Sequence, residues 1–196
     1  MKRSLLVFSI ALLSAPSAEA TILIKMDLPQ LVGRSDVIFV GKAIESRSHW
    51  SEDGRHIVTD TTFKVSQAVH GSPGSTVVIR RLGGKVGDIG MRVSGMPELR
   101  TGDEVLLFTE RRSNGKRYVV GMKQGVFRVH RDAAGRQMVA PGRLDGLTLA
   151  RRTPQGRLET VEPPATPAPQ PLGDLVKRIR LTVTYCAKEK SRCHAD

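Results

Sequence analysis

The chain of 196 residues has the length of one domain, or of one domain with short appendages. Apolar residues form 39% of the sequence, which is enough for a hydrophobic core and argues against wholesale disorder. The formal net charge is +12, but aromatic residues make up only 4%, too few for a surface on which nucleic-acid bases stack. We therefore expect no nucleic-acid partner.

The first twenty residues have the organisation of a signal peptide. Lys2 and Arg3 precede an apolar run over residues 5–13, which is far shorter than the roughly 20 residues of a membrane-spanning helix. The Ala18-Glu19-Ala20 segment fits the cleavage site of a signal peptidase, so we expect cleavage after Ala20 and export to the periplasm or beyond the cell. The alternative is a membrane anchor that stays in place. Cleavage removes two positive charges and one negative charge, which leaves the mature chain at +11.

A short helix and a series of strands are predicted for residues 21–141, which we expect to form one β-barrel domain. Asp27 suits the N-cap of the helix, Pro29 its first turn and Gly33 its end. Beyond Gly33, short apolar and β-branched runs alternate with turn sequences such as Asn114-Gly115. This pattern is typical of an all-β barrel or sandwich. The predicted strands cover residues 37–44, 57–65, 77–79, 104–110, 118–120 and 126–129, with a weaker strand around 138–139.

Two of these strands are predicted in more detail. The first begins with an uninterrupted apolar run over residues 37–40, which indicates burial near its start, and Gly41 then marks a bulge or bend. The second, over residues 57–65, alternates between two sets of side chains with a period of two. That alternation is typical of a strand with one buried face.

A long glycine-rich connection covers residues 83–102. Long loops on rigid scaffolds often carry recognition, so we take this segment as a candidate partner-binding loop, with Lys85, Asp88, Arg92 and Met96 as its candidate contacts. A phosphate-binding P-loop is disfavoured, because Lys85 is followed by valine instead of serine or threonine and no helix is predicted after it. A flexible or tightly turned loop without a binding role is the alternative.

The remaining chain divides into a linker and a tail. We expect residues 142–171 to be extended and Pro-rich, and residues 172–196 to form a C-terminal helix and tail. Leu172, Leu175, Val176 and Ile179 recur at helical spacing, and we expect their face to dock on the barrel. There are two alternatives. Residues 181–185 form a strand, or the helix face binds a partner chain or a membrane surface. No later apolar stretch approaches membrane-spanning length, so an integral membrane protein is not expected.

The cysteines lie in this tail. An exported protein meets an oxidising compartment, which favours a structural disulfide between Cys186 and Cys193. A redox pair typically has the spacing Cys-x-x-Cys, and two thiols with His194 give a zinc ion only three ligands.

The stretch from Ser35 to Phe108 resembles the OB-type barrel of the netrin-like class, which includes the tissue inhibitors of metalloproteinases. The resemblance rests on residues 35–43, on 63–65 leading through Val69-His70-Gly71 to 77–79, and on 102–108. The same pattern resembles uncharacterised exported bacterial proteins. It implies an all-β fold, a small OB-like barrel or sandwich with a short N-terminal helix. The family's inhibitors chelate the zinc of their protease through an N-terminal cysteine, but Thr21 stands in that place here, so this feature is not carried over.

These observations leave three hypotheses for function. The first is an exported, non-enzymatic binding or interaction protein without a cofactor, whose partner is an unknown protein or an anionic envelope component such as a lipid or polysaccharide. The second is a metal-dependent hydrolase that uses His49 and His56, which flank Glu52 and Asp53 in the first hairpin. A solvated hairpin tip is the simpler interpretation of those histidines. The third is a protease inhibitor that acts through its loops.

Overall fold

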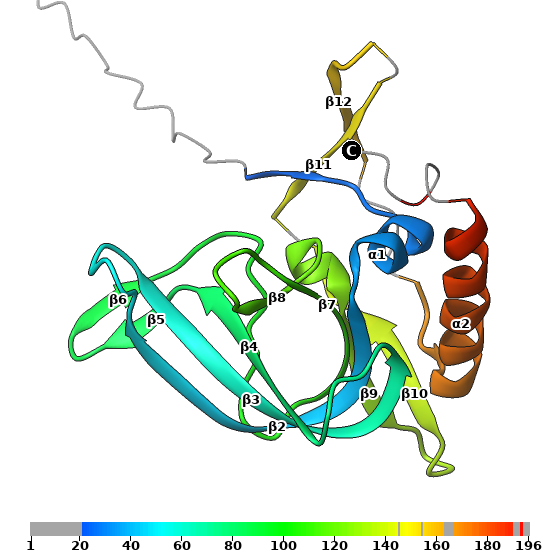
Figure 1. The fold of residues 1–196 in the computed structure, drawn as a ribbon, viewed down its shortest axis with the longest axis horizontal. Helices are drawn as coiled ribbons and strands as arrows, with labels where there is room; N and C mark the ends of the chain where they lie inside the picture. The colour runs from blue at the N-terminus through cyan, green and yellow to red at the C-terminus, as the bar shows by residue number, and fades with distance from the viewer. Residues whose placement is uncertain (1–20, 145, 154, 163–166, 190–192, 194–196) are drawn as a thin grey trace, which may run out of the picture.

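The computed structural model describes residues 21–189, except 145, 154 and 163–166, together with Cys193 (Figure 1). The expected signal peptide, residues 1–20, therefore lies outside the described residues, as does His194. No helix within the described part is long and apolar enough to cross a membrane. The fold is rich in β-structure, with two α-helices against one side of a strongly curled sheet (Figure 1).

The largest sheet within the described residues has eight strands, all antiparallel. Its hydrogen-bonded order is β13-β10-β9-β7-β2-β3-β4, and β8 pairs with β7 beside this path. This path does not return to its first strand, so the described strands form no closed barrel. Of the two predicted architectures, barrel and sandwich, a sandwich-like β-fold fits. The strands are β2 (Val37–Trp50), β3 (Ile57–His70), β4 (Thr76–Leu82), β7 (Glu104–Arg111), β8 (Arg117–Val119), β9 (Val126–Arg131), β10 (Gln137–Pro141) and β13 (Gln170–Pro171).

The curl of the sheet has a local cause in its two longest strands. The register between β2 and β3 shifts in three places, one of them between Val40 and Gly41, and such bulges bend a strand and increase its twist. A side chain at Gly41 would place a Cβ atom 2.8 Å from the Lys64 carbonyl oxygen, so only glycine fits there. The predicted bend at Gly41 is confirmed.

The core lies on both faces of the sheet, which explains the uninterrupted apolar run at the start of β2. Phe39 faces the inside of the curl, where its ring meets that of Phe63 edge-on at 6.0 Å between centroids. Ile38 and Val40 face the opposite side and pack in the cluster that includes both helices. Successive residues on a strand point to opposite faces, so a strand buried on both sides needs apolar residues throughout.

The two helices form where the sequence predicts them. Helix α1 (Leu28–Arg34) begins at Asp27, whose carboxylate accepts a hydrogen bond from the Gln30 backbone N–H at 2.9 Å, while the Gln30 side chain accepts from the Asp27 N–H. Helix α2 (Leu172–Lys188) buries the predicted apolar face, including Leu175 and Ile179, against α1 and the sheet. Docking of this face is therefore confirmed, and the strand expected as an alternative at 181–185 does not form.

The predicted disulfide joins the end of α2 to Cys193. The sulfur atoms of Cys186 and Cys193 are bonded, and both residues are buried. Cys193 packs closely on α1, because a Cβ atom at Gly33 would lie only 2.3 Å from the Cys193 carbonyl oxygen. Gly33 is the second-last residue of α1 and permits the close approach of Cys193, so the helix ends one residue later than predicted, at Arg34.

Residues 142–171 differ from the expected extended linker. They contain β11 (Thr148–Arg152) and β12 (Leu158–Val161), which pair with each other, and they end at β13. Strand β1 (Ile22–Ile24) adds to β11 in parallel, so a second sheet of three strands forms at the side of the first. Pro163 and Pro164 lie outside the described residues.

The glycine-rich connection also contains structure that the sequence did not predict. Strands β5 (Gly84–Val86) and β6 (Ile89–Met91) form a short hairpin within residues 83–102. Between β8 and β9, a 3₁₀ helix η1 (Met122–Gly125) turns the chain.

Candidate functional site

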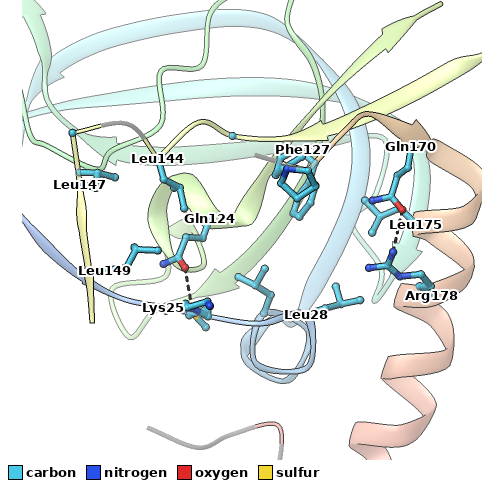
Figure 2. Close-up of a pocket in the computed structure, with 16 residues that line it drawn as sticks. Lys25, Leu28, Gln124, Phe127, Leu144, Leu147, Leu149, Gln170, Leu175 and Arg178 are labelled. Carbon is cyan, nitrogen blue, oxygen red and sulfur yellow. Dashed lines mark hydrogen bonds between the residues drawn. The ribbon is translucent and has the colours of Figure 1, made fainter. Parts of the chain in front are cut away.

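One cavity of the described molecule is mainly apolar and has a volume of about 550 Å³. It lies between the N-terminal segment, strands β9 and β10, the residues that lead into β11, and helix α2. Figure 2 shows its apolar walls, with three leucines on one side and three apolar side chains on the other. These six residues are Leu144, Leu147 and Leu149, and opposite them Leu28, Phe127 and Leu175.

Gln124 fixes the N-terminal wall of this cavity. Its amide nitrogen donates to the Ile24 carbonyl at 2.9 Å, and its amide oxygen accepts from the Met26 backbone N–H at 2.8 Å. The Lys25 backbone N–H also donates to the Ala150 carbonyl at 2.7 Å, in continuation of the pairing between β1 and β11. Residues just after the expected cleavage site therefore form one side of the cavity.

The charged residues in the described lining of the cavity have one sign. Among the described residues that line it, Lys25 and Arg178 are cationic, and none is aspartate or glutamate. Arg178 donates through Nη1 to the Gln170 side-chain oxygen at 3.0 Å, which joins α2 to β13 (Figure 2). Chemically, the described lining combines apolar walls with two cationic residues and contains no carboxylate, which suits an apolar chain that carries an anionic group.

The four candidate contacts of the glycine-rich connection divide into two pairs. Arg92 and Met96 line a cleft of about 360 Å³ beside the end of β4. Lys85 and Asp88 do not line this cleft and are exposed on the β5–β6 hairpin. The cleft also contains Arg81, which was not among the four candidate contacts.

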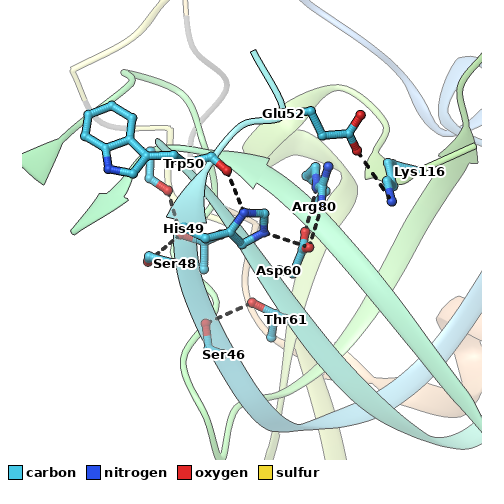
Figure 3. Close-up of polar contacts among 11 residues, drawn as sticks. Ser46, Ser48, His49, Trp50, Glu52, Asp60, Thr61, Arg80 and Lys116 are labelled. Atoms are coloured by element: carbon cyan, nitrogen blue, oxygen red, sulfur yellow. Dashed lines mark hydrogen bonds and ion pairs between the residues drawn. The ribbon is translucent and has the colours of Figure 1, made fainter. Parts of the chain in front are cut away.

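The histidines of the first hairpin take different roles from those of a metal site. His49 lies within hydrogen-bonding distance of two oxygen atoms, with Nε2 at 3.1 Å from Asp60 Oδ2 and Nδ1 at 2.8 Å from the Trp50 carbonyl (Figure 3). His56 uses its backbone N–H to donate to the Ser51 hydroxyl. Over the described residues, which include this whole hairpin, no group of three or more His, Cys, Asp or Glu side chains could hold a metal ion.

Asp60 is the centre of the polar network in Figure 3. Arg80 donates to both of its carboxylate oxygens, from Nε at 2.8 Å and from Nη2 at 2.6 Å. Burial by itself raises the pKa of Asp60, but the hydrogen bonds from Arg80 and His49 outweigh it and hold that pKa below its usual value. The network is a satisfied ion pair between neighbouring strands, with a structural role.

Sequence reasoning missed the cavity because its walls depend on distant pairing. Leu144, Leu147 and Leu149 have a visible apolar spacing, but they lie in the segment interpreted as a linker. Only the parallel pairing of Ile22–Ile24 with Thr148–Ala150 brings the N-terminal segment beside them. Comparison of the chain with protein-family models gives no match, and comparison with curated proteins gives none either.

Proposed function

We propose that the protein is an exported, non-enzymatic binding protein on an OB-like β-fold, and that its apolar cavity binds an amphipathic anion. The observation that carries the proposal is the cavity lining, which combines apolar walls with Lys25 and Arg178 and has no acidic residue among its described members. A volume of about 550 Å³ lies in the range of small-molecule sites. A disulfide and the expected signal peptide both fit export to an oxidising compartment.

The proposed ligand is a straight-chain carboxylate of roughly ten to twelve carbons. Each methylene group that leaves water for the cavity contributes about 0.8 kcal/mol, so such a chain offsets the several kcal/mol that association costs. The carboxylate adds charge complementarity with a mature chain of net charge +11. Arg178 is exposed and lies on α2 at the cavity wall, where its guanidinium is accessible to a ligand headgroup.

Titration of the mature protein with dodecanoate, dodecanol and dodecylamine tests this proposal. We expect saturable calorimetric binding of dodecanoate, weaker binding of dodecanol, and none of dodecylamine. Arg178→Gln should weaken dodecanoate binding by about tenfold, the effect of one charge-assisted contact. Arg180→Gln is the matched control, because it removes the same charge from the same helix outside the cavity lining.

The apolar part of the site needs a separate variant. Leu144→Gln places an amide in the cavity wall and should weaken the binding of both dodecanoate and dodecanol. Leu181→Gln, at a leucine that is 63% exposed, should leave both unchanged. Equal binding of dodecanoate and dodecylamine, or equal effects of Arg178→Gln and Arg180→Gln, would refute an anion-selective cavity.

A further inference from the structure

Arg81 lies on the inner face of the curled sheet. On β4, Val77 and Ile79 point into the core inside the curl, where they are 6% and 0% exposed. Alternate residues of a strand share a face, so Arg81 follows them on the inner side, opposite the buried Thr59 of β3. An arginine thus occupies a position at which the pattern of the strand calls for an apolar residue.

Arg80 and Arg81 differ in the hydrogen-bond partners of their guanidinium groups. Arg80 faces the other side of β4 and donates to both oxygens of Asp60 (Figure 3). The Nε atom of Arg81 is buried and has no hydrogen-bond partner among the described residues. Its Nη1 atom reaches only the carbonyls of Leu82 and Gly83, at 3.4 and 3.3 Å. Burial accordingly lowers the pKa of Arg81 from its ordinary value.

The cleft beside Arg81 has a fixed wall. A Cβ atom at Gly84 would lie 2.4 Å from both the Ser48 and the Thr59 hydroxyl oxygens, so the β5–β6 hairpin sits directly against β2 and β3. These hydroxyls are 2.9 Å apart, and the Thr59 hydroxyl donates to the Gly83 carbonyl at 2.6 Å. These contacts hold the hairpin in place and leave the Nε atom of Arg81 without a hydrogen-bond partner among the described residues.

The charge of the cleft is predominantly positive. Arg92 and Arg100 line it together with Arg81, against one acidic residue, Glu98. Glu98 is already paired, because its carboxylate accepts a hydrogen bond from Arg100 at 2.9 Å. Within the described residues, no carboxylate forms an ion pair with Arg81.

We propose that this cleft is a binding site for an oxyanion, a carboxylate or phosphate group, which pairs with the Arg81 guanidinium. The Nε–H and Nη–H groups of arginine form a fork that matches two oxygens of such a group. A buried donor without a partner costs free energy, and an apolar residue at this place would avoid that cost. A ligand that accepts hydrogen bonds from Arg81 would explain why an arginine stands here. This site is separate from the apolar cavity and does not depend on the proposal made for it.

The test compares two substitutions that remove the same charge. Mature wild-type protein, Arg81→Gln and Lys85→Gln are titrated with inorganic phosphate and with succinate at constant ionic strength, and binding is followed by NMR shifts of the cleft amides. We expect roughly millimolar binding of at least one anion, weakened about tenfold by Arg81→Gln and unchanged by Lys85→Gln. Lys85 is the matched control, because it lies on the adjacent hairpin outside the cleft.

The two anions distinguish the source of the group. Binding of phosphate alone assigns the site to a phosphate ligand, and binding of succinate assigns it to a carboxylate. Arg92→Gln, at an exposed residue, should also weaken binding and keeps the proposal testable if Arg81→Gln does not fold. Absence of saturable binding of either anion, or equal weakening by Arg81→Gln and Lys85→Gln, would overturn the proposal.

Discussion

The docking of α2 can be measured by truncating one buried side chain of that helix. Ile179 is 0% exposed and packs in the cluster formed by α1, α2 and the sheet. Replacing a fully buried isoleucine by alanine costs about 3 kcal/mol, from lost transfer free energy and the cavity that remains. Leu181, two residues further along the same helix, is 63% exposed, so Leu181→Ala should change the free energy of unfolding by less than about 0.5 kcal/mol.

Urea denaturation of the oxidised mature protein, followed by far-UV circular dichroism, provides the two free energies. Ile179→Ala should lower the urea concentration at the midpoint, with little change in the dependence of the free energy on urea. The same loss of about 3 kcal/mol should lower the melting temperature by about 6–12 °C. Both variants keep the helix propensity of α2, because alanine is the best helix former. If the two substitutions have equal effects, or if Ile179→Ala costs less than about 1 kcal/mol, α2 is not an integral part of the core.

Three further predictions concern stability. Reduction of the Cys186–Cys193 disulfide should lower the free energy of unfolding by about 2–3 kcal/mol, measured by denaturation with and without reductant, since the loop it closes is short. Gly33→Ala should destabilise by more than about 1 kcal/mol through its clash with the Cys193 carbonyl, whereas Gly173→Ala, with open space around it, should be neutral or stabilising in thermal melts. Asp60→Asn should cost about 1–2 kcal/mol at neutral pH. The pKa of Asp60 is lower in the folded protein than its usual value of 3.8. Its contribution to the free energy of unfolding is therefore complete above pH 3.8 and is lost as the pH falls through the folded pKa. The melting temperatures of variant and wild type should accordingly converge as the pH is lowered.

Local signals in the sequence predict most of the main sheet and both helices. The cap at Asp27, the alternation over residues 57–65 and the apolar face of α2 each express a preference that the residues carry by themselves. Strand β1 has only three residues, and its partner Thr148–Ala150 lies far along the chain. No local period indicates such a pairing, so the second sheet and the cavity beside it could not be predicted.

The Arg81 cleft had a signal that sequence analysis did not use. Val77-Val78-Ile79 looks like a continuous apolar run, but only Val77 and Ile79 are buried, while Val78 is 50% exposed. Once that alternation is known, Arg81 falls on the inner face and Arg80 on the outer one. The candidate contacts Lys85 and Asp88 lie on the β5–β6 hairpin, whereas the buried Nε atom without a partner belongs to Arg81, on the strand before it.

Both candidate sites arise where the described sheet leaves a space at its margin. At the β4 end, the ladder path stops instead of continuing to another strand, and the inner face beside Arg81 is bordered by the β5–β6 hairpin and residues 92–100. Near the β13 end, α2 and the N-terminal segment enclose the apolar cavity. The apolar cavity lies on the helix side of the sheet, beside the cluster that contains Leu31 and Leu175, whereas Arg81 lies on the inner face. The same fold therefore carries two chemically different recesses at opposite ends of the strand order, an apolar cavity with Lys25 and Arg178 and an arginine cleft.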